Sequence, residues 1–419
     1  MSMFIRTIKN RSELQTVFKS VGVDPAGAAI MSRKAFLHII DIGEIDTRGA
    51  NIFKQEALAC GADLALPKDA AGYKVPRVRG VLMATEKQIG LIAGKLKGQP
   101  FGLKKVAVLL GEVLENFWKE KFLLKSPYGH ELSLDKPVVM GVLNVTPDSF
   151  SDGGKFNSIN SSVKRVGEMV EQGAKIIDIG GESTGPGSKD VSVMEEIKRV
   201  VPVIESVRKK FPDIFISIDT YKSEVVKAAY KAGADMVNDV TAGRGDPKMF
   251  SVVVKCKMPI VLMYSKDSSA RTTRDKIQYE DVMRSVSSFL EGRVSEARAQ
   301  GVEQVIVDPG MGAFVSGEPK YSFEILRRLS ELKSFGLPIL IGASRKSFLG
   351  GAVGTECRIS NTEYREEKEG RVRNSQFGIR YSNRLEGSLA CAVVAVMNGA
   401  KIIRAHDVGE TVKVVVSSK

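Results

Sequence analysis

From residue 137 onward, short apolar segments alternate with longer amphipathic segments, and this alternation restricts the fold more than any other feature of the sequence. Apolar runs of this kind are typical of strands buried on both faces of a parallel sheet, and the amphipathic runs between them are typical of covering helices. Eight such units in about 280 residues favour a closed (β/α)8 TIM barrel, an α/β fold, over an open sheet. The expected strands are 138–144, 175–180, 214–219, 235–240, 259–264, 304–308, 338–342 and 401–404, and the helices between them include 161–172, 195–210 and 322–335.

The first 118 residues have a different pattern, and we expect a separate small α/β or α+β domain there. Residues 119–136 are polar and contain turn signals, which indicates a linker, so the barrel is expected over 137–419. We find no phosphate-binding loop, metal cluster or nucleophile in the first domain, and its role stays open. Its expected helices are 12–20, 51–60, 86–97 and 103–117, and its expected strands are 36–42, 63–66 and 80–85.

One segment of the barrel, 351–383, is charged, poor in core residues and much longer than the usual loop of about 2–6 residues in such units. Its composition is typical of a solvated excursion. It also follows the seventh strand on the side where barrels carry their chemistry, so a role as a lid stays open.

Composition excludes several classes of protein. The net charge of +13 is spread over both parts of the chain without a basic block, which suits an anionic small substrate and does not call for nucleic acid. No apolar run approaches the ~20 residues of a membrane span, and the N-terminus lacks the apolar core of a secretory signal. The four Cys and three His residues do not cluster, so structural zinc is not expected, and free thiols indicate a reducing compartment. We therefore expect a cytoplasmic protein with no membrane partner.

Polar side chains end four of the expected strands. Asp178, Asp219, Asn238 and Asp308 follow apolar runs. Any one of them alone could cap a helix, but burying all four costs free energy unless a partner binds them. Because chemistry in these barrels takes place at the carboxyl ends of the strands, we expect them to surround one pocket, together with Lys346 after the seventh strand. Carboxylates and an amide suit a flat heterocycle that bears N–H and amino donors.

A second group of strand-end residues suits a polyanion. Asn144, Arg404 and His406 offer an amide, a guanidinium and an imidazole. A magnesium ion with phosphate oxygens would fit beside Asn144, because magnesium takes few protein ligands and keeps waters. A lone histidine such as His406 is more often packed than functional. The residues together suggest a heterocycle site next to a diphosphate site.

Seven sequence strings make the family resemblance specific. The chain from 137 to 419 resembles dihydropteroate synthase, and some bacterial members of that family carry a comparable N-terminal extension with segments like KQEAL and QPFGL. The strings that carry the resemblance are, in order, MGVLNVTPDSFSDGGKF, IDIGGEST, ISIDTYK, DPGMG, ASRKSFLG, RLEGSLA and IIRAHDVGET.

The resemblance implies a transferase, active as a homodimer, that condenses 6-hydroxymethyl-7,8-dihydropterin diphosphate with p-aminobenzoate. The products are dihydropteroate and diphosphate, in folate or methanopterin-type biosynthesis. Diphosphate leaves first, and the amine attacks the resulting pterin cation, so no protein nucleophile is needed. The implied catalytic residues are Asp219, Lys346, Arg404 and His406. The implied sites are Asp178, Asp219, Asn238, Met263, Asp308, Lys346 and Arg404 for the pterin; Asn144, Arg404 and His406 for diphosphate, with Asn144 also holding Mg²⁺; and Thr184, Pro186 and Ser347 for the arylamine.

Three positions depart from the family pattern. Gly185 stands where the family usually has an arginine that holds the diphosphate and frames the arylamine site, and Arg345 and Lys189 are candidates to replace it. Ala313, followed by Phe314, replaces an aromatic residue after the sixth strand, and Tyr264 replaces a frequent histidine. The arylamine pocket is therefore expected to be roomier and less basic than usual, so a larger acceptor such as a ribosylated aminobenzoate is a candidate.

The sequence alone leaves two other functions open. A related pterin-binding barrel passes a methyl group to a corrinoid, although it would not need the diphosphate residues. A catalytically impaired pterin-binding protein is the other alternative, suggested by Gly185 and Ala313.

Overall fold

The structure is a computed structural model, and it describes residues 3–145, 155–353 and 378–417. The chain divides into two compact units, Met1–Trp118 and Lys119–Lys419. Most of the charged segment 351–383, whose role as a lid or a solvated excursion the sequence left open, lies outside the described residues. The same holds for residues 146–154 after the first barrel strand.

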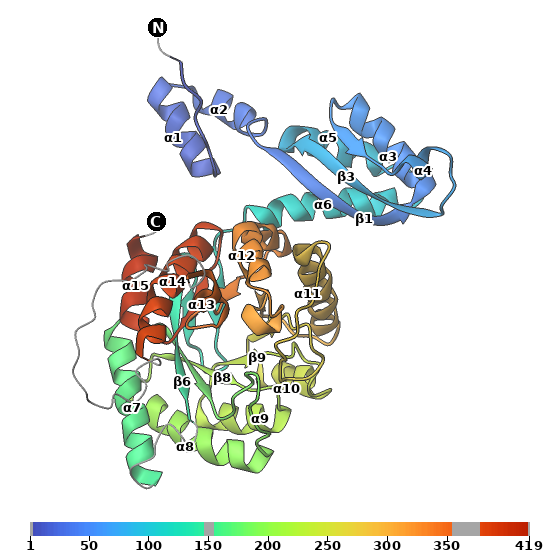
Figure 1. Cartoon of the computed structure of the whole chain (residues 1–419). Helices are drawn as coiled ribbons and strands as arrows, with labels where there is room; N and C mark the ends of the chain where they lie inside the picture. The colour runs from blue at the N-terminus through green and yellow to red at the C-terminus, as the bar shows by residue number, and fades with distance from the viewer. Residues whose placement is uncertain (1–2, 146–154, 354–377, 418–419) are drawn as a thin grey trace, which may run out of the picture. The chain divides into compact units, whose positions relative to one another are not determined.

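The N-terminal unit is a small α/β unit, as expected. Its three strands form an antiparallel sheet in the order β1-β3-β2, and one hydrophobic core joins this sheet to α3, α5 and α6 (Figure 1). The sequence missed two short helices, α2 and α4. The elements are α1 (Arg11–Val21), α2 (Pro25–Ser32), β1 (Leu37–Asp46), α3 (Thr47–Ala59), β2 (Asp63–Ala65), α4 (Lys68–Ala71), β3 (Arg77–Thr85), α5 (Glu86–Leu96) and α6 (Leu103–Phe117).

The second unit is the predicted (β/α)8 barrel. Its eight parallel strands follow the order β11-β10-β9-β8-β7-β6-β13-β12. A parallel bridge between Val307 and Ile339 joins the first and last of these strands, so the sheet closes on itself. The prediction of a closed barrel is therefore confirmed. The strands are β6 (Val138–Asn144), β7 (Ile176–Gly180), β8 (Phe215–Asp219), β9 (Met236–Asp239), β10 (Ile260–Met263), β11 (Val305–Asp308), β12 (Leu340–Ile341) and β13 (Ile402–Ala405).

Helices cover the outside of the barrel (Figure 1): α7 to α14 lie in the connections between consecutive strands, and α15 follows the last strand. Local signals fix their ends: the Ser192 hydroxyl accepts a hydrogen bond from the amide of Glu195 at the start of α8, and Gly233 ends α9 with a φ of 108°. The helices are α7 (Lys155–Glu171), α8 (Val193–Lys210), α9 (Ser223–Ala232), α10 (Met249–Cys256), α11 (Val282–Ala299), α12 (Pro319–Arg328), α13 (Phe348–Val353), α14 (Gly378–Met397) and α15 (Val408–Ser417).

One layer of side chains fills the amino end of the barrel. Each of the eight strands contributes one buried apolar residue to it, and Leu124 and Leu134 pack against this layer from outside the sheet. Because this end is filled and covered, any substrate site of the barrel belongs at the opposite end, where the strands finish. The eight strand residues are Met140, Ile176, Phe215, Met236, Val261, Ile306, Leu340 and Ile402.

Residues 119–136 differ from the linker that their polarity suggested. They contain a two-stranded hairpin, β4 (Leu123–Lys125) and β5 (Glu131–Ser133), and they belong to the barrel unit. Asp235 is fully buried and anchors the hairpin, because its carboxylate accepts a hydrogen bond from Ser126 (2.5 Å) and lies 3.1 Å from Nδ1 of His130, while Arg208 of α8 pairs with it from the barrel side (2.5 Å). Leu124 and Leu134 are the buried apolar residues of this hairpin. Because polar residues surround both of them, the sequence pattern did not indicate that they are buried.

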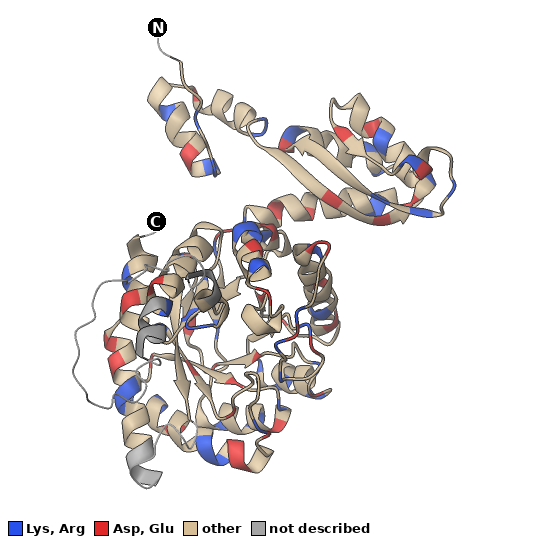
Figure 2. Ribbon diagram, in the orientation of Figure 1, with Lys and Arg blue, Asp and Glu red and all other residues tan. Residues whose placement is uncertain are grey.

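Charges of both signs are interspersed along the outer helices (Figure 2), in line with the diffuse net charge. No helix among the described residues is both long and apolar enough to cross a membrane. The three described cysteines, Cys60, Cys256 and Cys391, are free thiols.

Candidate active site

A guanidinium joins two carboxylates at the carboxyl end of the barrel. Arg404, in β13, donates from Nε to Oδ2 of Asp178 at 2.6 Å and from Nη2 to Oδ2 of Asp219 at 2.7 Å. Asn238 donates its side-chain amide to the same oxygen of Asp178 at 3.0 Å. Strand register explains the meeting, because Gly180 pairs with Asp219 and Asp219 pairs with Asn238 across neighbouring strands. The structure thus brings together four of the residues predicted from strand ends.

One atom of this network has no partner within the described part of the chain. Asp178 is completely buried, and its Oδ1 makes no hydrogen bond there. An unpaired buried carboxylate oxygen costs free energy comparable to a lost hydrogen bond, so a ligand donor or an ordered water is needed to pair with it. The site can therefore accept a hydrogen bond from a ligand donor.

The network also shifts the pKa values of its members. Burial, and then the neighbouring carboxylate of Asp178, raise the pKa of Asp219, although Arg404 opposes the shift. Burial disfavours the charged form of Arg404, but Asp178 and Asp219 outweigh it and raise the pKa of Arg404. Arg404 is therefore a permanent cation, and Asp219 becomes more acidic when hydrogen-bond donors of a ligand reach it.

A carboxylate and an ammonium form the next part of the site. Burial raises the pKa of Asp308 to about 6, and Lys346 opposes this shift. Burial lowers the pKa of Lys346 to about 8, although Asp308 opposes it. The Nζ atom of Lys346 donates to the carbonyl of Met311 at 3.0 Å, and it lies 5.1 Å from the ring centre of Phe314. Lys346 is thus held in place and poised to lose its proton just above neutral pH.

An apolar wall accompanies these charged groups. Met263, at the end of β10, packs in one buried cluster with Val240 and Ala270, and Tyr221 and Phe314 pack against that cluster. Phe314 thus supplies an aromatic ring beside the position where Ala313 departs from the family pattern. A flat ring needs an apolar surface of this kind beside its polar edges.

His406 lies just beyond β13. Its Nδ1 is 3.2 Å from the hydroxyl of Ser344, and burial together with the cations Arg404 and Arg345 lowers the pKa of His406 to about 4. The imidazole is therefore neutral at pH 7. Arg345 donates from Nε to Asp407 at 2.9 Å, so the structure commits it to that carboxylate instead of to the place of the missing arginine at 185.

Glu182, after β7, stabilises the second loop through two cations. Its buried carboxylate accepts hydrogen bonds from Lys222 and Arg271. Lys222 also reaches the buried carboxylate of Glu196 at 2.7 Å. The sequence did not single out Arg271, because it lies in a polar stretch after the fifth strand where neither periodicity nor a motif marks it.

Some predicted site residues stay apart from this network. Asn144 is exposed at the end of β6, Pro186 and Ser347 are exposed in their loops, and Thr184 is half-buried. In residues 3–145, 155–353 and 378–417, no hydrogen bond or ion pair joins these four residues to the carboxylates and Arg404. The same residues contain no group of three or more His, Cys, Asp or Glu side chains that could hold a metal ion.

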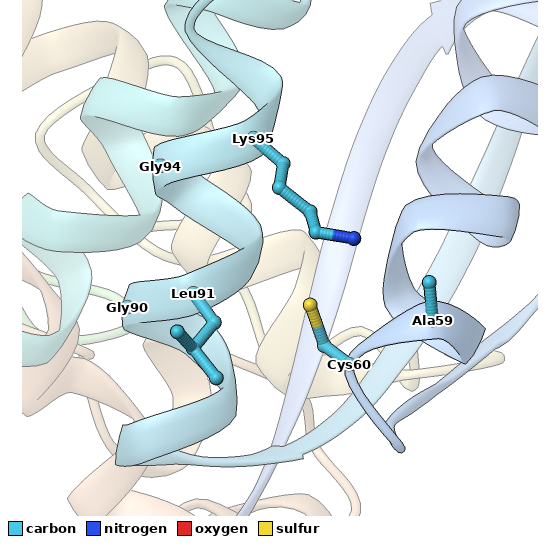
Figure 3. A pocket seen from close by; sticks show the side chains of 6 residues that line it. All are labelled: Ala59, Cys60, Gly90, Leu91, Gly94 and Lys95. Atoms are coloured by element: carbon cyan, nitrogen blue, oxygen red, sulfur yellow. The ribbon is translucent and has the colours of Figure 1, made fainter.

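The N-terminal unit has a hollow of its own, between the end of α3 and one face of α5 (Figure 3). Its lining brings together one thiol, Cys60, and one ammonium, Lys95, which pairs with Glu56 at 3.0 Å. This lining offers no arrangement for acid–base or nucleophilic chemistry. The residues that line it are Ala59, Cys60, Gly90, Leu91, Gly94 and Lys95.

Comparison with known proteins assigns this closed barrel, with carboxylates, a lysine and an arginine at its strand ends, to the class of pterin-binding enzymes. The family described as pterin binding enzyme matches residues 140–406. Escherichia coli dihydropteroate synthase is 39% identical over 287 residues, covering 68% of this chain and 92% of that protein. A solved structure of Xanthomonas albilineans dihydropteroate synthase with 4-aminobenzoic acid has a TM-score of 0.58 and 36% identity, covering 70% of this chain and 96% of the other.

A third relative extends further toward the N-terminus. A protein of Halobacterium salinarum, described as a probable bifunctional folylpolyglutamate synthase/dihydropteroate synthase, is 36% identical over 400 residues. The match covers 94% of this chain and 44% of that protein, so it includes most of the N-terminal unit. The chain belongs to the dihydropteroate synthase family. It is a transferase with a pterin-binding (β/α)8 barrel.

Proposed function

We propose that this enzyme condenses 6-hydroxymethyl-7,8-dihydropterin diphosphate with p-aminobenzoate or a related arylamine, to give dihydropteroate and diphosphate. The observation that carries the proposal is the Asp178–Arg404–Asp219 arrangement, in which Asp178 is fully buried and its Oδ1 has no partner among the described residues. Such an arrangement suits the N–H and amino donors of a pterin ring.

Different residues of the barrel would bind the polar edge of the pterin, contact its face and stabilise its charge. Asp178, Asn238 and Asp308 would bond its polar edge, and Met263 would contact its face. The carboxylate of Asp219 would oppose the positive charge that develops when the bond between the exocyclic carbon and the diphosphate oxygen breaks. The amine nitrogen then bonds to that carbon and loses a proton. Lys346, charged below pH 8, would donate to a ring acceptor.

Arg404 and His406 would hold the departing diphosphate. Arg404 remains charged because two carboxylates face it, and a neutral His406 can donate one hydrogen bond. Asn144 fits a magnesium ion in one respect, since its amide oxygen is a hard donor and is exposed at the strand end. A Mg²⁺ ion held there by Asn144 would supply positive charge to stabilise the departing diphosphate.

The acceptor site is proposed at Thr184, Pro186 and Ser347. A Cβ added at Gly185 would meet only the Ser183 hydroxyl, at 3.6 Å, so a side chain can start there without a clash. This observation favours a larger arylamine, such as a ribosylated aminobenzoate, as a second candidate acceptor beside p-aminobenzoate.

The test is to incubate the pure chain with pterin diphosphate, Mg²⁺ and each arylamine, and to detect product by mass spectrometry. We expect dihydropteroate or its ribosylated counterpart, with one diphosphate released per product. Binding of the pterin diphosphate with no turnover of any arylamine would instead support a catalytically impaired protein. Methyl transfer to a corrinoid in place of condensation would contradict the proposal.

A homodimer and a cytoplasmic location are also proposals, which rest on the family resemblance and on the sequence. Light scattering of the full chain and of a chain lacking residues 1–118 would determine the oligomeric state. Comparing the activity of the two chains would determine whether the N-terminal unit serves the reaction.

A further inference from the structure

One side chain spans two loops at the carboxyl end of the barrel. Arg271 belongs to the loop that follows β10, and it holds the loop that follows β7. It donates from Nε to the carbonyl of Ser188 at 3.2 Å and from Nη2 to the carbonyl of Lys189 at 2.9 Å. It also pairs with the carboxylates of Glu182 and Asp190. All of these partners lie in or next to the segment 183–190, which carries Thr184 and Pro186.

The partner at the base of that segment is fixed. Only 3% of the Glu182 side chain is exposed, and Lys222 holds its carboxylate while also pairing with the buried Glu196. Tyr221, from the same turn as Lys222, places its hydroxyl 3.5 Å from Glu182. Arg271 therefore binds a carboxylate that Lys222 already holds in place. Through the same guanidinium it also fixes the exposed end of the loop, at Ser188 and Lys189.

The segment around Arg271 is in turn tied to the loop that follows β11. The hydroxyl of Thr272 donates to the carbonyl of Ala313 at 2.8 Å, and the amide of Lys266 donates to the carbonyl of Phe314 at 2.8 Å. Asp267 closes the segment on itself by accepting from the backbone amide of Thr273 at 3.0 Å. Two consecutive residues, Arg271 and Thr272, thus face two different loops of the proposed acceptor site.

The segment 183–190 needs such support. Gly185 and Gly187 flank Pro186, and Gly187 has a φ of 84°, so the loop gains much conformational freedom when it is released. Because residue 185 is a glycine, the loop also has no arginine side chain there that could hold it to the rest of the site. Arg271 reaches it from outside through backbone carbonyls, which do not depend on the side chains that the loop carries.

We propose that Arg271 is the positioning residue for the arylamine: it holds the segment 183–190 to the loop after β10, which is itself bonded to the loop after β11, so that the acceptor pocket is formed before substrate binds. This inference rests on the proposed function. Arg271 acts through the loop and contacts no reacting atom. Its loss should therefore weaken arylamine binding and leave pterin binding intact.

The experiment uses the full chain with Arg271→Ala, Arg271→Lys and the control Arg274→Ala, which removes an exposed arginine from the same loop. Steady-state kinetics with p-aminobenzoate should give a KM about 10-fold higher or more for Arg271→Ala, as expected for lost charge-assisted hydrogen bonds. The KM for pterin diphosphate should stay within about twofold of wild type, since it is bound elsewhere. Arg271→Lys keeps the charge but not the fork of donors, so an intermediate KM is expected. Arg274→Ala should behave as wild type.

A second measurement needs no substrate. Backbone amides in 183–190 should exchange with deuterium at least about fivefold faster in Arg271→Ala, while those of α9 keep the wild-type rate. A wild-type KM for the arylamine together with unchanged exchange would overturn the proposal, and so would an equal rise in the KM of both substrates. A wild-type chain that forms no product would contradict the proposed function, and the exchange measurement would still test Arg271. Should Arg271→Ala unfold, Arg271→Lys carries both measurements.

Discussion

The Nε atom of Arg404 lies 2.6 Å from Oδ2 of Asp178, a carboxylate with no exposed surface. Removing one member of a buried ion pair is costly, because the other member stays buried and unpaired. Asp178→Asn keeps the shape but removes the charge. We expect it to lower the free energy of unfolding by about 1–3 kcal/mol and to weaken pterin diphosphate binding about 100-fold. Urea unfolding and calorimetry check both values.

Asp213→Asn is the control for that experiment, since Asp213 is exposed at the far end of β8. Its unfolding free energy and its pterin affinity should match those of the wild type. Normal pterin affinity in Asp178→Asn would remove Asp178 from the pterin site.

Lys346 sets an alkaline limit for the reaction. Its ammonium is present below a pKa of about 8 and is lost above it. If the charged form binds the pterin, kcat/KM for the pterin diphosphate falls as the pH rises through 8. In Lys346→Arg the guanidinium keeps its proton, so the residual kcat/KM should not fall as the pH rises through 8. The same alkaline fall in kcat/KM in both proteins would assign the titration to another group.

His406 links stability to pH in the acidic range. Its pKa is about 4 in the folded chain and near the ordinary 6.5 when unfolded, so between these values the unfolded chain binds the extra proton. The contribution to stability is present above pH 6.5 and is lost as the pH falls toward 4. Between pH 7 and 5, His406→Gln should therefore lose less unfolding free energy than wild type in urea titrations. Parallel losses in the two proteins would argue against a lowered pKa.

The hairpin below the barrel depends on Asp235. Its carboxylate accepts from Ser126 and Arg208, and also from the amide of Ile216 at 2.6 Å. Asp235→Ala leaves buried donors without an acceptor, so a loss of about 3–5 kcal/mol in unfolding free energy is expected. The exposed Asp213→Ala should change it by less than about 0.5 kcal/mol. Chemical denaturation of both variants measures the difference, and equal values would mean that the Asp235 carboxylate adds no stability.

Gly185 tests the shape and charge of the acceptor site. A Cβ added at this position makes no clash, since the nearest atom to it is the Ser183 hydroxyl, 3.6 Å away. Gly185→Arg should lower the KM for p-aminobenzoate by about 10-fold through a restored charge-assisted contact. It should raise the KM for a ribosylated aminobenzoate, because it fills the open space. An unchanged KM for both acceptors would show that position 185 does not face the arylamine.

The sequence alone determined the barrel and the identity of the strand-end groups. The alternation of apolar and amphipathic segments requires eight covered parallel strands, and this periodicity is local enough to read without coordinates. The strings around Asp178, Asp219, Lys346 and Arg404 carried the family resemblance. The sequence could not show that residues 119–136 plug the barrel, because two buried leucines among polar residues give no periodic signal.

Only the tertiary structure decided how these groups act on one another. Asp178 and Arg404 are 226 positions apart, and their pairing follows from the closure of the sheet. The same closure buries Lys346 and His406 and thereby lowers their pKa values. The role of Arg271 in supporting the loop that contains Gly185 depends on the fold, because the fold brings two loops that are distant in sequence side by side. Burial and long-range pairing depend on the whole fold, whereas strand and helix periodicity depends on neighbours along the chain.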